Sequence, residues 1–449
     1  MNNVTQNMRT SVKFINHASV IISGDGVSIL SDPWFFGDAF HKGWNLLYEL
    51  DHDEILKILN EITHIWISHE HPDHFSIPFF KRYIKFIKER NIIILFQKTI
   101  DQRVYKFLKN LELDVHELDY DMRHNLSENY SITCIKDGFY DSALFIECYG
   151  EKILNLNDCD VKSVSAAKKI YSITGKIDVL LSQFSYAAWK GGVKNKKWRL
   201  EAAAEKIKTL RLQVDIFCPK FFIPFASYFL FSNIENFYLN DAVNKPDYLS
   251  KLFDNCASKI LIMAPNDILG GKNEVLDEIK ALNFWKKKYL KVNSYSLNQY
   301  KTVSFDELKK NFFIYCKRIK KNNSIILIKF LRSLKIFCPV VVNIIDLNLS
   351  LKFDYIKEFI EETNEKAMIS MKSESLNFIF KNAFGFDTLT VNGCFEECHK
   401  GGFVKATKSL AIENLNNLGI KIEIKTFFKF SIIKLFLVRL YRVASKLNT

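Results

Sequence analysis

Apolar residues in the first 270 positions form short runs whose spacing changes along the chain. Residues 11–23 and 27–32 are rich in branched and aromatic side chains, and the turn sequence Gly24-Asp25-Gly26 separates them. This arrangement predicts two strand segments joined by a tight turn. Residues 63–68 form a short, continuously apolar run of the buried-strand type, and residues 77–90 carry apolar side chains at helical spacing. Strands therefore come in pairs first and alternate with helices later.

The alternation continues and then changes character near residue 295. The expected later elements are a strand pair at 144–158, a buried strand at 177–183 and helices at 199–213, 305–321 and 409–418. We predict an α/β layered domain over residues 1–285, a small α+β domain over residues 295–420 and a separate tail over residues 421–449.

Composition supports a folded, cytoplasmic protein. Of the 449 residues, 48% are hydrophobic and 14% aromatic, which excludes wholesale disorder and provides for two cores. The nine cysteines are scattered and contain no C-x-x-C pair, as expected for reduced thiols. We read no signal peptide in the first residues and no uncharged run of the roughly 20 residues that a membrane-spanning helix needs.

The formal charge of +13 is concentrated at the end of the chain, where residues 421–449 hold five Lys, two Arg and one Glu. Charge this local argues against a nucleic-acid partner, and the general excess of cations suits a small anionic substrate. On a helical wheel, residues 431–447 place their cations on one arc and their apolar side chains on the other. Two interpretations stay open: peripheral contact with the anionic inner face of a membrane, or docking on the protein's own core.

The strongest chemical signal is the sequence Ser-His-Glu-His-Pro-Asp-His, which follows the apolar run at 63–67. His69, His71, Asp73 and His74 fall within six residues. Imidazole and carboxylate groups are ligands for zinc, iron or manganese. The alternative is a polar loop in which Asp73 caps the next helix and the histidines are solvated. The tight clustering of ligand types favours a metal site.

This motif resembles the H-x-H-x-D-H signature of the metallo-β-lactamase superfamily. Residues 16–37 are similar to that superfamily's opening hairpin, and residues 150–160 to its later motif, in which a strand ends in a metal-bridging carboxylate, here Asp158. The resemblance spans about residues 10–270 and implies a four-layer αββα sandwich holding one or two divalent ions, iron or zinc. It implies these metal ligands: His69, His71, Asp73, His74 and Asp158.

Residues 222–241 and 264–271 look most like the CMP-N-acetylneuraminate hydroxylase branch of the superfamily. That branch hydroxylates an N-acetyl group on a nucleotide sugar, with electrons drawn through a Rieske iron–sulfur domain. The resemblance implies catalytic roles for Asp73 and His17 and substrate contacts for Ser227, Asn233 and Asp267. An alternative for His17 is a strand residue bonded to backbone. Residues 368–397 vaguely resemble a sterol-carrier-type fold, and a plain packing domain is the alternative.

Two departures from the family pattern change the expected chemistry. A Rieske cluster uses C-x-H and C-x-x-H pairs, and no histidine of this sequence has either spacing. Electrons for an oxygenase would then come from a separate donor protein. The only histidine after residue 124 is His399, so the two isolated histidines of most superfamily hydrolases are missing. The matching regions offer Asp137 or Asp141, and Ser227.

A site completed by carboxylates resembles the two-His-one-carboxylate arrangement of non-haem iron oxygenases. Together with this arrangement, the resemblance implies a metal-dependent enzyme that modifies a nucleotide sugar or glycoconjugate precursor, by N-acyl hydroxylation or by hydrolysis. The alternative is a non-catalytic metal-binding scaffold in a membrane-associated assembly. Asp32, in the sequence Ser-Asp-Pro-Trp, either orients a ligand histidine or forms a turn.

Overall fold

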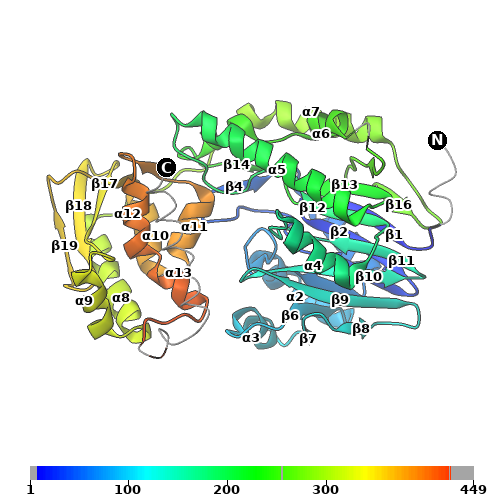
Figure 1. The fold of residues 1–449 in the computed structure, drawn as a ribbon, viewed down its shortest axis with the longest axis horizontal. Helices are drawn as coiled ribbons and strands as arrows, with labels where there is room; N and C mark the ends of the chain where they lie inside the picture. The colour runs from blue at the N-terminus through cyan, green and yellow to red at the C-terminus, as the bar shows by residue number, and fades with distance from the viewer. Residues whose placement is uncertain (1–7, 254–255, 424, 426–449) are drawn as a thin grey trace. The chain divides into compact units, whose positions relative to one another are not determined.

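The computed structural model describes residues 8–253, 256–423 and 425, and it divides the chain into two units, Met1–Asn298 and Gln299–Thr449 (Figure 1). The basic helix expected over residues 431–447 lies outside the described residues. Within the described ranges, every helix is too short or too polar to cross a bilayer.

Two seven-stranded sheets form the first unit. The first sheet has the order β16 (Ile268–Gly270), β1 (Ser11–Asn16), β2 (Ser19–Gly24), β3 (Val27–Ser31), β5 (His64–Ile67), β6 (Ile93–Gln97) and β7 (Val115–Leu118). The second has the order β15 (Lys259–Ile260), β13 (Phe221–Phe225), β12 (Val179–Gln183), β11 (Glu151–Asn155), β10 (Asp141–Cys148), β9 (Tyr130–Asp137) and β8 (Arg123–Asn125).

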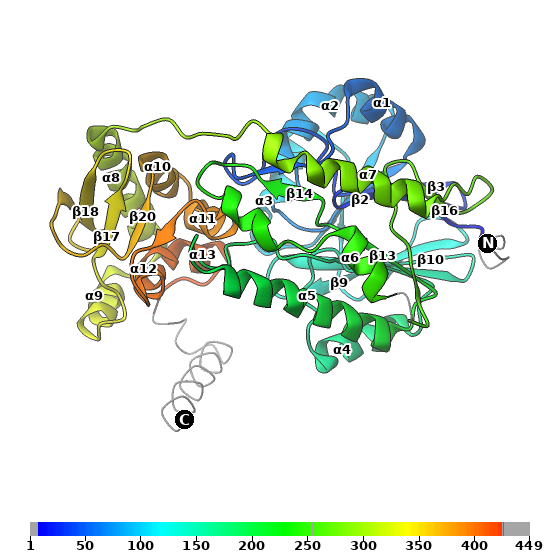
Figure 2. The same ribbon diagram turned by 90° about the horizontal axis from the view of Figure 1, so that it is seen from above.

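Helices cover the outer face of each sheet (Figures 1 and 2). The helices on the first sheet are α1 (His52–Glu61), α2 (Ile77–Glu89) and α3 (Arg103–Asn110), and those on the second are α4 (Val164–Thr174) and α5 (Lys196–Phe217). The unit is completed by η1 (Phe237–Ala242), α6 (Pro246–Leu252), α7 (Glu278–Leu290) and η2 (Val292–Ser294). The expected αββα sandwich is confirmed.

Successive side chains of a strand point to opposite faces of its sheet, and this explains the four layers. In β5, Ile65 and Ile67 face the core beneath α1, α2 and α3, whereas Trp66 faces the core between the two sheets. A strand buried on both faces must be apolar at every position, which is why this segment shows no polar alternation. Helix α2 begins where Ser76 accepts a hydrogen bond from Phe79 N, 3.4 Å away. Asp73 therefore does not cap this helix.

The carboxyl ends of the parallel strands lie at one edge of the sandwich. Strands β3, β5, β6 and β7 pair in parallel in the first sheet, as do β11, β12, β13 and β15 in the second. Because parallel strands end at the same edge, the loops after them meet there. A two-stranded ribbon of β4 (Trp44–Leu46) and β14 (Phe229–Phe231) is also built from segments of this unit.

The second unit packs helices on a five-stranded sheet. Its strands have the order β19 (Phe359–Glu362), β18 (Leu349–Asp354), β17 (Val340–Ile344), β20 (Ile369–Met371) and β21 (Glu396–Glu397). Its helices are α8 (Phe305–Asn322), α9 (Ile325–Ser333), α10 (Ser373–Lys381), α11 (Gly385–Asn392), α12 (Gly402–Leu410) and α13 (Ile412–Asn417). Phe312 of α8 and Phe380 of α10 meet edge to face, 5.3 Å apart, and both contact Phe353 of β18.

Candidate metal centre

A buried cluster of imidazoles and carboxylates lies at the shared edge of the two sheets. Two groups of three have ligand atoms that all lie within 4.8 Å of one another: His17 with Asp73 and His74, and His69 with His74 and Asp158. His17 stands in the two-residue turn between β1 and β2, at a φ of 24°. That backbone conformation is uncommon for a side chain with a Cβ, so the turn is held in place by its surroundings.

Distances within the first group match those between ligands of one ion. Asp73 Oδ2 lies 3.4 Å from His17 Nε2 and 3.3 Å from His74 Nε2. Ligand atoms about 2.1 Å from a metal, at angles of roughly 90–110°, stand about 3.0–3.4 Å apart. Both nitrogens of His17, Nε2 of His74 and Oδ1 of Asp73 are buried and make no hydrogen bond within the described residues. Buried polar atoms without partners are rare, and a metal would satisfy them.

The second group extends to His71 and Asp141. His69 Nε2 lies 2.9 Å from His71 Nδ1 and 3.6 Å from Asp141 Oδ1, and His74 Nε2 lies 3.5 Å from Asp158 Oδ2. Of the two aspartates that the sequence offered in this region, Asp141 is the one beside the histidines. Asp137 instead accepts a hydrogen bond from the backbone of Asp160. The two groups share His74, whose Nε2 lies between Asp73 and Asp158.

Asp32 contacts the Nδ1 atom of His74. This fully buried carboxylate accepts hydrogen bonds from Ser68 N and Ser68 Oγ, both at 2.8 Å, and from the side-chain amide of Asn157. It also lies 3.0 Å from His74 Nδ1. Because Nδ1 is engaged by Asp32, Nε2 of the same ring is the nitrogen directed to a metal. Asp32 has a φ of 39°, so it both shapes the turn and orients the ligand.

Mutual electrostatic effects tune the buried groups. Burial raises the pKa of Asp73, but the nearby His74 and His17 outweigh it and hold that pKa well below its usual range. Burial lowers the pKa of His74, but Asp73, Asp158 and Asp32 raise it well above the usual value. Burial, together with His74 and His71, holds the pKa of His69 well below its ordinary value. Its imidazole is therefore neutral near pH 7, as a metal ligand must be.

The pH dependence of stability tests the environment of Asp141. Burial raises the pKa of this carboxyl from 3.8 to about 7, although 27% of the side chain is exposed. Between these values the folded, metal-free protein binds more protons than the unfolded chain, so this group lowers the free energy of unfolding as pH rises. We expect Asp141→Asn to gain stability relative to the native sequence from pH 4 to pH 7 and no further above it. Urea unfolding of metal-free protein measures this, and parallel pH curves would contradict it.

A hydrogen-bonded chain supports Asp158 from the second sheet. Gln183, at the end of β12, donates from Nε2 to Asp158 Oδ1 at 2.8 Å. Lys206 of α5 donates from Nζ to the side-chain amide oxygen Oε1 of Gln183. The two residues fix one carboxylate oxygen of Asp158, which leaves Oδ2 facing His74. Outer partners of this kind set the orientation of metal ligands.

Aromatic side chains pack against His17 and His71 of the cluster. Trp34 and Phe229 meet the His17 ring edge to face, at 5.3 and 5.7 Å, and Phe40 lies 5.7 Å from the His71 ring. Trp44 stacks on Phe229 at 3.8 Å. The loop that carries Phe40 has positive φ at three consecutive residues, 40 to 42. Such strained backbone needs tertiary support, and the buried aromatic ribbon provides it.

The three residues expected to contact substrate are engaged in local structure. Ser227 Oγ accepts hydrogen bonds from Phe184 N and Ser185 N, at 3.1 and 3.0 Å. Asn233 accepts from Glu235 N in the turn that follows β14 and donates from Nδ2 to the carbonyl oxygen of Lys42, and Asp267 Oδ2 accepts from Ala264 N at 2.7 Å. In the described part of the chain, these side chains form no hydrogen bond with a candidate ligand of the cluster. Sequence reasoning missed Gln183 and Lys206; the position of Gln183 at the end of a parallel strand was the available signal.

The αββα sandwich carries at its edge a cluster of imidazoles and carboxylates that could hold metal ions. Residues 11–137 match the family model described as "Beta-lactamase superfamily domain". Over these residues the N-terminal unit is similar to the metallo-β-lactamase superfamily, whose fold it shares.

Particular proteins that are similar to this chain include hydroxylases. The chain is similar to the cytidine monophosphate-N-acetylneuraminic acid hydroxylase of Danio rerio, with 25% identity over 291 residues, 61% of this chain and 47% of that protein. It is also 25% identical to the inactive human counterpart over 252 residues, 53% of this chain and 48% of that protein. The chain thus spans about half the length of these relatives. Among solved structures, CmlA, a diiron β-hydroxylase from Streptomyces venezuelae, matches 59% of this chain and 55% of its own, with 15% identity and a TM-score of 0.41.

Proposed function

We propose that the protein is a metal-dependent enzyme that hydroxylates the N-acyl group of an anionic nucleotide sugar or related glycoconjugate precursor. The observation that carries the proposal is the cluster in which three aspartates, Asp73, Asp141 and Asp158, complete the histidine motif. Carboxylate-rich sets with imidazole suit iron. The similarity to cytidine monophosphate-N-acetylneuraminic acid hydroxylases supports the choice of substrate class.

Each residue has a definite task in this proposal. His69, His71 and Asp141 would hold one ion, and His17, Asp73 and His74 a second, with Asp158 beside His69 and His74. When bound, the metal supplies oxygen activation if it is iron, or a water with its pKa lowered toward about 7 if it is zinc.

Asp73 and the aromatic wall would control protons and water. Oδ1 of Asp73 is buried and has no hydrogen-bond partner among the described residues, and in this proposal it would accept a proton during the reaction. Phe40, Trp44 and Phe229 keep bulk water from the His17 side of the cluster. Electrons for the hydroxylation would come from a separate donor protein.

Hydrolysis of an amide, ester or phosphoester is the second candidate. It is favoured by His74, whose Nε2 lies 3.3 and 3.5 Å from Asp73 and Asp158, because a ligand between two carboxylates also suits a two-zinc site. The same residues would serve, with Asp73 accepting the proton of the attacking water.

Metal analysis of protein purified without chelators tests the proposal. We expect about two iron ions per chain, because the cluster contains two adjoining groups of ligands. Elemental analysis by mass spectrometry, compared with protein concentration from amino-acid analysis, gives the ratio. Two zinc ions per chain would favour hydrolysis, and protein free of metal would support a non-catalytic scaffold instead.

A further inference from the structure

A pocket of about 290 Å³ opens beside Asp158, on the side away from His74. Its wall includes Asp158 and Gln183 of the metal region and three lysines, Lys162, Lys190 and Lys206. We propose that this pocket binds an anionic group of the substrate, a phosphate or a carboxylate, through Lys190 and Lys206. The inference rests on the proposed function, because it places the anion next to a metal ligand.

The two lysines lack acidic partners. Within the described residues, no carboxylate lies within ion-pair distance of Lys190 or Lys206. Among the described residues, the Lys206 ammonium donates its hydrogen bond to the neutral side chain of Gln183, and Asp158 and Asp160 act on its charge without contacting it. Lys162 differs, since it pairs with Asp160 at 2.5 Å.

Their surroundings make an anion favourable. Burial lowers the pKa of both amines, and the closeness of Lys206 lowers that of Lys190 further. Two partly buried cations that face one pocket repel each other, and an anion between them removes this cost.

The acidic residues of the pocket have other partners or face solvent. Asp158 directs one oxygen to Gln183 and the other to His74, and Asp160 pairs with Lys162. Glu205 is exposed, and it acts on the charge of Lys190 without forming an ion pair with it in the described structure. Metal ions bound by Asp158 would make the wall still more positive.

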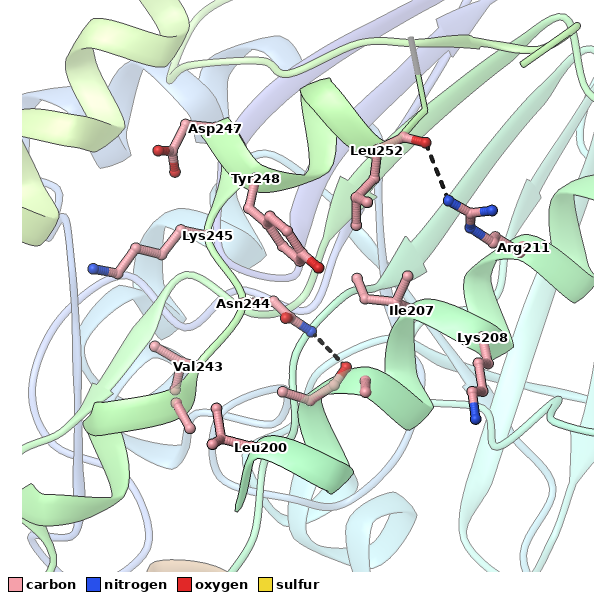
Figure 3. A pocket seen from close by; sticks show the side chains of 13 residues that line it. Leu200, Ile207, Lys208, Arg211, Val243, Asn244, Lys245, Asp247, Tyr248 and Leu252 are labelled. Atoms are coloured by element: carbon pink, nitrogen blue, oxygen red, sulfur yellow. Dashed lines mark hydrogen bonds between the residues drawn. The ribbon is translucent and has the colours of Figure 1, made fainter. Parts of the chain in front are cut away.

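The geometry of α5 gives the pocket its shape and supplies a control. Ala202, Glu205, Lys206 and Thr209 recur at helical spacing and line this pocket. Lys208 lies on another face of α5 and lines a different hollow, of about 660 Å³, between α5 and α6 (Figure 3). That hollow is lined largely by apolar side chains, and its Asn244 and Arg211 donate to backbone carbonyls.

Calorimetric titration of the purified full-length protein with inorganic phosphate tests the proposal. We expect Lys190→Gln to weaken phosphate binding about tenfold or more, because a charge-assisted hydrogen bond is lost. Lys208→Gln should bind phosphate as the native protein does, and Lys190→Arg should retain most of the affinity. A parallel titration with acetate distinguishes a phosphate pocket from a carboxylate pocket.

Equal phosphate affinity in Lys190→Gln and Lys208→Gln would overturn the proposal, because the anion would then be held elsewhere, for example by the metals. The metal content of each sample is measured alongside. Loss of metal from the native protein would count against the proposed function, whereas a metal-loaded protein indifferent to Lys190 would count against this pocket alone.

Discussion

Replacing His71 by Ala is expected to remove at least one of the two metal ions from the purified protein while leaving its fold intact. His71 Nδ1 lies 2.9 Å from His69 Nε2, the separation of two ligands of one ion. Loss of an outer partner weakens metal binding about 10–100-fold, and loss of a ligand should cost more. The side chain is only partly buried, so its removal leaves no large cavity. Metal per chain, thermal unfolding and circular dichroism together measure the effect.

His116→Ala is the matched control for this prediction. His116 lies on β7 with 55% of its side chain exposed, beside Asp114 and away from the cluster. This variant should keep the metal content of the native protein. Native metal content in His71→Ala would show that the ion is held by other residues, and unfolding of that variant would show that His71 has a structural role.

The layered fold follows closely from local patterns. The run at 63–67 becomes β5 and the amphipathic run at 77–90 becomes α2, because the first ends in three consecutive apolar residues, 65–67, and the second is apolar at helical spacing. Four metal-ligand candidates lie between these two elements, so their mutual closeness is local and could be predicted. The elements of the second unit were harder to predict from the sequence. Residues 366–397 contain two helices, α10 and α11, between short strands. Short apolar runs there do not distinguish helix from strand.

The rest of the site depends on contacts that no local pattern encodes. The choice between Asp137 and Asp141 arises because they face each other across the β9–β10 hairpin, and only the tertiary structure turns one of them toward His69. His17 reaches the cluster through an unusual turn whose carbonyl accepts a hydrogen bond from Ala226, 209 residues later. Lys190 and Lys206 converge from a loop and a helix.

Local sequence patterns and tertiary contacts thus determine different parts of the site. For this reason the histidine motif alone does not identify the metal or the reaction. A histidine-rich loop indicates a metal site, but the candidate ligands that complete it come from the turn after β1, the start of β10 and the loop after β11. Those residues are His17, Asp141 and Asp158, an imidazole and two carboxylates. The proposal of iron rests on these added carboxylates, and their closeness to the histidines became visible only in the tertiary structure.

Replacing Asp32 by Ala is expected to lower the free energy of unfolding by about 3–5 kcal/mol, the usual result of removing one partner from a buried charged network. The carboxylate is fully buried and holds Ser68, Asn157 and His74 at once, so each would lose an acceptor. Without Asp32, His74 would lose the bond that directs its Nε2, and metal affinity should fall about 10–100-fold. Urea unfolding of metal-free protein at pH 7 and metal titration measure the two effects separately.

Two further variants separate the causes. Asp32→Asn keeps the side-chain volume and tolerates the positive φ of 39°, so its loss of stability reports the charge rather than the turn. Asp119→Ala removes a surface carboxylate, 48% exposed, that pairs with Lys98, and it should change stability by no more than about 1 kcal/mol. If Asp32→Ala were as mild as Asp119→Ala, Asp32 would be only a turn residue. The orientation of His74 would then have to come from Ser68, whose Oγ lies 3.5 Å from the same nitrogen.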